Sequence, residues 1–117
     1  MWYKITVLHH SLVSIIYLKA RSNSMIVPNP VMKALVTLAI EATLLDVGKS
    51  VYDTVTTRLY KKYDCYTSDC FEKPEYLREV LKELYAKSYN EIVNSIQEEL
   101  KEINNNKKIE TFLQVLS

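Results

Sequence analysis

Glycine, cysteine and proline are scarce in this sequence of 117 residues, which contains one, two and three of them, respectively. A single glycine excludes the glycine-rich phosphate loops, whose motifs need several. With so few prolines, it also argues against collagen-like, low-complexity and turn-rich all-β chains. Two cysteines are too few for a disulfide scaffold. What remains, at 48% hydrophobic and 25% charged residues, is the composition of one ordinary globular domain.

An excess of charge of one sign is missing as well. Fifteen Lys and Arg stand against 14 Asp and Glu, which leaves a net charge of +1. No global charge therefore draws the chain to nucleic acid or to a membrane surface. Lysine outnumbers arginine by 12 to 3 and glutamate outnumbers aspartate by 10 to 4, a trend of hyperthermophiles, whereas seven thermolabile asparagines point the other way. A thermophilic source stays open, and intracellular proteins of such organisms can keep disulfides.

Long hydrophobic runs are also absent. The longest candidate, residues 5–18, is interrupted by four polar side chains, those of His9, His10, Ser11 and Ser14. As a helix it rises about 1.5 Å per residue and falls short of the roughly 30 Å hydrocarbon core of a bilayer. As a signal peptide it has histidines in its apolar region and no small-residue cleavage site after Ala20. We therefore expect a cytoplasmic protein that does not bind membranes.

Residues 1–24 differ from the rest of the chain. They hold the single tryptophan and both histidines, and they contain no acidic residue. The apolar residues within positions 5–16 fit a strand as well as a helix, and the polar run 21–24 is typical of a linker. We therefore divide the chain into an N-terminal extension, residues 1–24, which is either not native or disordered, and a helical domain, residues 25–117. The domain alone has 12 Lys and Arg against 14 Asp and Glu, a net charge of −2.

Apolar residues recur at helical spacing in the first half of this domain. A first helix is predicted over residues 30–45, with Asn29 as its N-cap. Gly48 permits a short turn to a second helix, which ends at residue 63 and for which Asp46 is a candidate cap. A short link between two amphipathic helices favours an antiparallel hairpin.

The second half is predicted to be helical too. Pro74 is suited to the first position of a third helix. The pattern shifts phase at residues 86–88, where Ser88 is a candidate cap for a fourth helix that reaches residue 103. The third and fourth helices are either separate or one bent rod. A short last helix is predicted over residues 109–116.

Together these segments predict an all-α fold, a single compact bundle of about five helices. It comprises a helical hairpin, a loop that holds both cysteines, two further helices and a short C-terminal helix, over residues 30–63, 64–73, 74–103 and 109–116, respectively. The predicted core faces are Met32, Leu35, Val36, Ala39, Ile40 and Thr43; Val51, Val55, Leu59 and Tyr63; Leu77, Val80, Leu81 and Leu84; Ile92, Val93, Ile96, Leu100 and Ile103; and Ile109, Phe112, Leu113 and Leu116.

Cys65 and Cys70 are the first candidates for chemistry. They form one C-x₄-C pair with no second pair, whereas a structural zinc site commonly uses two pairs. The C-x-x-C motif of thiol oxidoreductases is absent. Two interpretations remain open: a pair of buried free thiols, or a disulfide that staples the loop.

Other catalytic or metal-binding patterns are missing. His9 and His10 are adjacent, so they point apart in a helix or a strand and make poor joint ligands. No other histidine exists to form a catalytic triad or a helix-bundle di-iron site. A row of glutamates along the third helix is typical of a solvated face, although such a row can also serve acid–base chemistry; it comprises Glu72, Glu75, Glu79 and Glu83. We expect no enzyme activity, metal or cofactor.

Tyrosines cluster in the middle of the chain, several of them beside basic residues of the second helix. The candidate interaction surface is formed by Tyr52, Arg58, Tyr60, Lys61 and Lys62. Tyrosine is enriched at protein interfaces, so we expect a protein partner or a homo-oligomer. The alternative is a nucleic-acid-binding regulator, which requires Lys49, Arg58, Lys61 and Lys62 on one face. A helix-turn-helix match is weak, because the second helix begins with few typical base-reading residues.

Several segments of the chain together resemble the archaeal NitrOD-type output domain. They read LDVGKSVY at 45–52, LYKKY at 59–63, Cys65 with SDC at 68–70, PEYL at 74–77 and IETFL at 109–113. The resemblance covers most of residues 32–116 and excludes residues 1–24. It implies an archaeal, intracellular, non-enzymatic helical module associated with signalling proteins, and it carries over no catalytic residue.

Overall fold

Every helix predicted from the apolar spacing is present in the computed structural model, which describes residues 29–103 and 106–117. The elements are α2 (Asn29–Val47), α3 (Lys49–Tyr63), η1 (Thr67–Asp69), α4 (Pro74–Tyr85), η2 (Ala86–Ser88), α5 (Tyr89–Glu99) and α6 (Lys107–Leu116), of which η1 and η2 are short 3₁₀ segments. These residues contain no strand, so the all-α bundle is confirmed. The predicted extension, residues 1–24, and Met25 lie outside the described residues.

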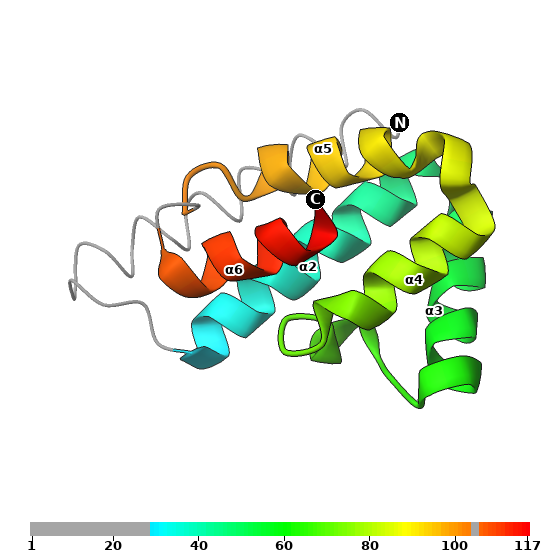
Figure 1. The fold of residues 1–117 in the computed structure, drawn as a ribbon, viewed down its shortest axis with the longest axis horizontal. Helices are drawn as coiled ribbons and strands as arrows, with labels where there is room; N and C mark the ends of the chain where they lie inside the picture. Colours follow the sequence, from blue (N-terminus) through cyan, green and yellow to red (C-terminus); the bar gives the residue numbers. More distant parts are fainter. Residues whose placement is uncertain (1–28, 104–105) are drawn as a thin grey trace.

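Helix α2 occupies the middle of the bundle. It runs diagonally through the molecule (Figure 1). Helix α5 lies along one side of it, and α3 and α4 lie toward the end of the molecule at which α2 ends. It packs against α3, α5 and η1, while α4 packs against α3 and α6. The central position follows from its composition, because a helix with so few charged residues has little surface suited to water. No helix among the described residues is both long and apolar enough to cross a membrane.

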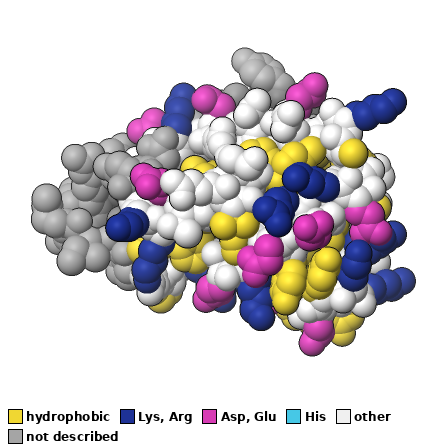
Figure 2. All heavy atoms as spheres, in the orientation of Figure 1, with side chains coloured by type: hydrophobic (Ala, Val, Ile, Leu, Met, Phe, Trp, Pro, Cys, Tyr) yellow, Lys and Arg dark blue, Asp and Glu magenta, His cyan; other side chains and the backbone are white. Residues whose placement is uncertain are grey.

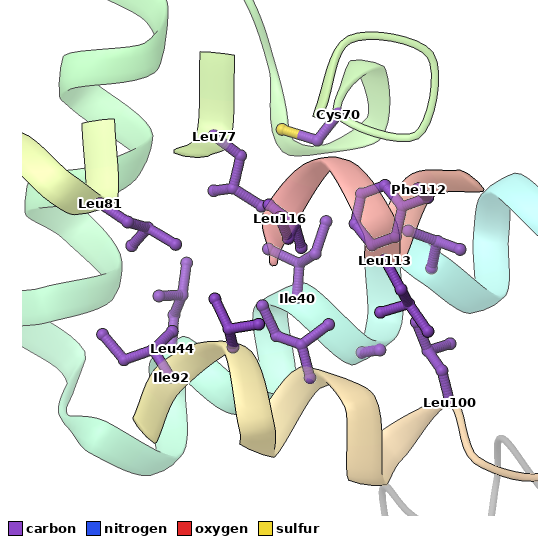
Figure 3. Close-up of a cluster of buried hydrophobic side chains, with 14 of the residues drawn as sticks. Ile40, Leu44, Cys70, Leu77, Leu81, Ile92, Leu100, Phe112, Leu113 and Leu116 are labelled. Carbon is purple, nitrogen blue, oxygen red and sulfur yellow. The ribbon is translucent and has the colours of Figure 1, made fainter. Parts of the chain in front are cut away.

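The predicted apolar faces form the core. All six residues predicted for α2 are buried. The residues predicted for the core face of α5 and the turns that follow it are buried too, as are those of α6. In α3 and α4 the predicted faces are split, because Val51, Tyr63 and Leu84 lie half-buried at the edge of the core. Figure 3 shows side chains from α2, α4, α5 and α6 meeting in one cluster, with Cys70 of the loop at its edge. The buried residues of the loop therefore belong to the same hydrophobic core as those of the helices.

Three predicted helix starts differ in detail from the structure. Helix α2 begins at Asn29, and the side-chain oxygen of Asn29 accepts a hydrogen bond from Lys108 Nζ at 2.8 Å. Asp46 lies inside α2, and the N-cap of α3 is Gly48, which has an extended conformation. Ser88 does precede α5, but its side chain makes no cap hydrogen bond. The positions of the breaks were predictable, whereas the partners of the polar side chains were not.

The third and fourth helices are separate. The 3₁₀ segment η2 lies between α4 and α5, and the chain bends there (Figure 1). Helix α5 ends at Glu99, four residues earlier than predicted. Leu100 and Ile103 are still buried, because they follow in turns that keep them on the core side. Asn106 then caps α6, since its side-chain oxygen accepts the backbone N–H of Lys108 at 2.9 Å.

Candidate interaction surface at the cysteine loop

The end of α3 fixes where the cysteine loop begins. Asp64 adopts a left-handed conformation (φ 51°, ψ 43°), and its N–H donates to the carbonyl of Tyr60 at 2.9 Å. The N–H of Cys65 donates to the carbonyl of Leu59 at 3.2 Å. Aspartate is among the few non-glycine residues that visit this conformation readily, and such a residue commonly ends a helix. The chain therefore reverses at Asp64 and carries Cys65 into the core beside Leu59.

A 3₁₀ turn then holds the rest of the loop. The carboxylate of Asp69 accepts the N–H of Tyr66 at 2.9 Å, and the N–H of Asp69 donates to the carbonyl of Tyr66 at the same distance. The N–H of Cys70 donates to the carbonyl of Thr67 at 3.2 Å. These reciprocal bonds satisfy backbone groups that a short turn otherwise leaves unpaired.

Both cysteines are buried thiols in this structure. Each thiol donates toward the same acceptor, the carbonyl of Tyr66, with S···O distances of 3.4 Å for Cys65 and 3.7 Å for Cys70. Burial is the main cause that raises the pKa of both thiols above the ordinary range. A raised pKa keeps the thiol in its unreactive protonated form, so this pair lacks the thiolate of a redox catalyst.

A single carboxylate on α2 ties the loop to the central helix. Glu41 Oε2 accepts a hydrogen bond from Thr67 Oγ1 at 2.8 Å and another from the Tyr52 hydroxyl at 3.4 Å. Burial, followed by the charge of Glu41, raises the pKa of the Tyr52 hydroxyl. Glu41 was missing from the residues predicted for the site. The available signal was its position as a carboxylate in the middle of a largely apolar helix.

We expect the replacement Thr67→Val to lower the free energy of unfolding by about 1–2 kcal/mol, because it removes a hydrogen bond to a charged group without changing the side-chain shape. Urea denaturation at neutral pH measures the loss. Thr54→Val is the matched control, since Thr54 is exposed on α3 and bonds only to the carbonyl of Ser50. Equal effects of the two substitutions would contradict the role given to Glu41.

Two tyrosine rings stand out from the loop and the end of α3. Tyr60 and Tyr66 are 50% and 60% exposed, and their ring centroids lie 5.4 Å apart. We call these two residues the exposed tyrosine pair. Beside it, Tyr63 stacks on Tyr76 of α4 with centroids 4.3 Å apart and ring planes 8° apart, and both rings are half-buried. The stacked rings support α3 against α4, whereas the exposed tyrosine pair is left to the solvent.

The structure divides the residues predicted for the interaction surface. Arg58 and Lys62 both turn toward α4, where they pair with the carboxylate of Glu83 at 2.7 Å and 3.4 Å. Tyr52 is half-buried against Glu41, so only Tyr60 and Lys61 of the predicted set are exposed without an ion pair among the described residues. Tyr66 was not part of the predicted surface, and the reversal at Asp64 brings it beside Tyr60.

The basic face required for nucleic-acid binding is largely neutralised. Lys49 pairs with Asp53 at 3.2 Å, and Glu83 neutralises part of the charge of Arg58 and Lys62. The face of the molecule seen in Figure 2 carries Lys and Arg side chains interspersed with Asp and Glu, with hydrophobic side chains between them. A surface with mixed charges offers a polyanion few contacts that release counterions.

Three of the four glutamates of the predicted row form ion pairs. Glu79 pairs with Arg78 at 3.6 Å, and Glu83 pairs across to Arg58 of α3 at 2.7 Å. The ammonium of Lys82 lies 5.2 Å from the ring centroid of Tyr89. Glu72 pairs with Lys33 at 3.2 Å with 60% of its side chain exposed. Exposed ion pairs are screened by water, so this row lacks the desolvated carboxylates typical of acid–base catalysis.

A groove of about 700 Å³ lies where α2, α4 and α6 begin, and Glu72 and Glu75 line it. Its walls are mainly apolar, with Phe71, Phe112 and Val115, and its rim carries Lys33, Lys107 and Lys108.

Among residues 29–103 and 106–117 no group of three or more His, Cys, Asp or Glu could hold a metal ion. His9 and His10 lie outside the described residues.

Comparison of the sequence with protein-family models and with curated proteins gave no match, and comparison with solved structures gave none either.

Proposed function

We propose that the chain is an intracellular helical module that works by binding another protein or a second copy of itself. The observation that carries this proposal is the exposed tyrosine pair, in which two large rings are half or more exposed and pack on each other at 5.4 Å. Tyrosine supplies a large contact area with few rotatable bonds, and it is enriched among the residues that dominate binding energy. The resemblance to NitrOD-type output domains belongs to the same proposal, since it implies a module associated with signalling proteins.

The loop geometry supports the exposed tyrosine pair as a binding surface. The backbone of Tyr66 is held by the Asp69 carboxylate and N–H, and the next residue, Thr67, is anchored on Glu41. The ring of Tyr66 therefore projects from a fixed backbone, so binding has less conformational entropy to overcome than at a mobile loop.

The alternative function, a nucleic-acid-binding regulator, has less support from the same region. Bases can stack on the exposed tyrosine pair. However, three of the four basic residues expected on this face, Lys49, Arg58 and Lys62, are engaged with carboxylates. Only Lys61 would then supply unpaired positive charge among the residues of that face.

The test is site-specific photo-crosslinking of the full chain in the cells that produce it. A photoreactive phenylalanine derivative replaces Tyr60 or Tyr66, and as a control Glu98 of α5, whose side chain is 74% exposed. We expect a nuclease-resistant product of defined mass from positions 60 and 66 but not from position 98. A product of twice the chain mass indicates self-association. The same products at position 98, or no product at all, would overturn the proposal, and a product removed by nuclease would support the alternative.

Alanine substitutions then measure the contribution of each ring. Tyr60→Ala and Tyr66→Ala are each expected to weaken binding of the crosslinked partner by about 30-fold or more, which corresponds to the hot-spot range of about 2 kcal/mol or more. Glu98→Ala is the control and should change the affinity less than twofold. Titration calorimetry with the purified partner gives the dissociation constants. Unchanged affinity in both tyrosine variants would show that the crosslinks arise from proximity alone.

A further inference from the structure

The two thiols of the loop are held side by side by the backbone on either side of them. Cys65 is placed by the helix end, through the N–H of Cys65 to the Leu59 carbonyl. Cys70 is placed by the 3₁₀ turn, through the N–H of Cys70 to the Thr67 carbonyl. Both sulfurs lie within 3.7 Å of one oxygen, the carbonyl of Tyr66. The side chains are therefore positioned relative to each other by contacts that do not depend on the thiols themselves.

We propose that Cys65 and Cys70 are an oxidisable pair that closes into an intramolecular disulfide by exchange with a small-molecule disulfide, and that this bond locks the segment bearing Tyr66. In the first step the thiolate of one cysteine attacks the small disulfide, which forms a mixed disulfide and releases one small thiol. In the second step the other cysteine attacks the cysteine sulfur of the mixed disulfide and releases the second small thiol. The pair loses two electrons and two protons, and the small disulfide gains them.

The structure tolerates the oxidised form. The Tyr66 carbonyl loses two weak S–H donors when the bond forms, but it keeps the N–H of Asp69 at 2.9 Å. No buried backbone acceptor is left unpaired, so oxidation carries no penalty of that kind. Proximity also favours closure over a stable mixed disulfide, because the second thiol is already next to the first.

The burial of the pair determines which kind of disulfide this is. Thiols with a raised pKa are poor leaving groups, so a disulfide between them resists reduction. The protonated, buried thiols also react slowly, so exchange proceeds through local opening of the loop. The pair is thus suited to a slow and lasting change of state and not to repeated catalytic turnover.

The consequence for binding rests on the proposed function. Tyr66 lies within the loop that the disulfide closes, and its ring is half of the exposed tyrosine pair. A covalent bond between positions 65 and 70 limits the opening of this loop, so less conformational entropy is lost when a partner binds. The oxidised chain is therefore the form with the higher affinity.

The test begins with the pair alone and needs no partner. The full native chain is incubated with oxidised glutathione, quenched with acid, then denatured, alkylated with iodoacetamide and weighed intact. We expect a chain lighter by two hydrogens that takes up no alkyl group. Cys65→Ser and Cys70→Ser each keep one thiol, and each is expected to accumulate the glutathione adduct. Two alkylated thiols, a persistent adduct or a disulfide-linked dimer in the unsubstituted chain would overturn the proposal.

A second measurement tests the link to binding. The oxidised chain should bind the partner captured through the exposed tyrosine pair at least fivefold more tightly than the reduced chain, and Cys65→Ser/Cys70→Ser should bind like the reduced chain under both conditions. Equal affinities would overturn the regulatory part while the disulfide stands. If no partner is captured, the proposed function and the regulatory part fail together, and the mass measurement still decides whether the pair closes.

Discussion

Replacing Leu44 by alanine is expected to lower the free energy of unfolding by about 2–5 kcal/mol. The Leu44 side chain is fully buried and belongs to the same core cluster as Leu81 of α4 and Ile92 of α5 (Figure 3). Truncation removes apolar contacts and leaves a cavity that a close-packed interior fills only in part. Urea denaturation monitored by circular dichroism gives the difference, provided that the unfolding slope is unchanged.

Val47→Ala is the matched control for this prediction. Val47 lies three residues further along the same helix and is 54% exposed, so its truncation is expected to change the free energy of unfolding by less than about 0.5 kcal/mol. A loss below 1 kcal/mol for Leu44→Ala, or similar losses for both substitutions, would contradict the central position of α2 in the core.

Stability is expected to fall steeply in alkaline solution because of Cys70. Burial, and then the neighbouring Cys65, raises the pKa of the Cys70 thiol far above its ordinary value of about 9. Above pH 9 the unfolded chain releases this proton while the folded chain keeps it, so the unfolded state binds fewer protons and is favoured as the pH rises. One such group lowers the free energy of unfolding by about 1.4 kcal/mol per pH unit. The contribution is fully present below about pH 8 and declines from pH 9 upward.

The comparison that isolates this effect uses Cys70→Ala under reducing conditions. This variant is less stable at neutral pH, since it loses a buried side chain, but its free energy of unfolding should decline less between pH 8.5 and 10.5, by about 2 kcal/mol. Other groups with raised pKa values, such as Tyr52 and Tyr89, titrate in both chains and cancel in the difference. Parallel pH profiles of the two chains would show that Cys70 does not keep its proton in the folded state.

The helices and their buried faces were predictable because they follow from local spacing. The stripe from Met32 to Thr43 repeats at the helical period, and a helix that is apolar over most of its surface has to be buried. Pro74 marks the start of α4 for an equally local reason. None of these inferences requires knowledge of which helices are neighbours.

The candidate site was predicted less well, because its contacts join distant parts of the sequence. Glu41 and Thr67 are 26 positions apart, and Arg58 and Glu83 are 25 apart. A basic residue on a helix has the same appearance in the sequence whether it faces solvent or a carboxylate of the next helix. The pairing of Tyr60 with Tyr66 depended on one left-handed residue, Asp64, which no periodic pattern identifies.

Glu83 has a consequence for how this fold can change during evolution. Its single carboxylate contacts both Arg58 and Lys62, one turn apart on α3. If Glu83 is lost, two like charges remain side by side at helical spacing, which is unfavourable. In descendants of this chain we therefore expect a neutral residue at position 83 to be accompanied by the loss of a basic residue at position 58 or 62, so that three positions vary together across the contact between α3 and α4.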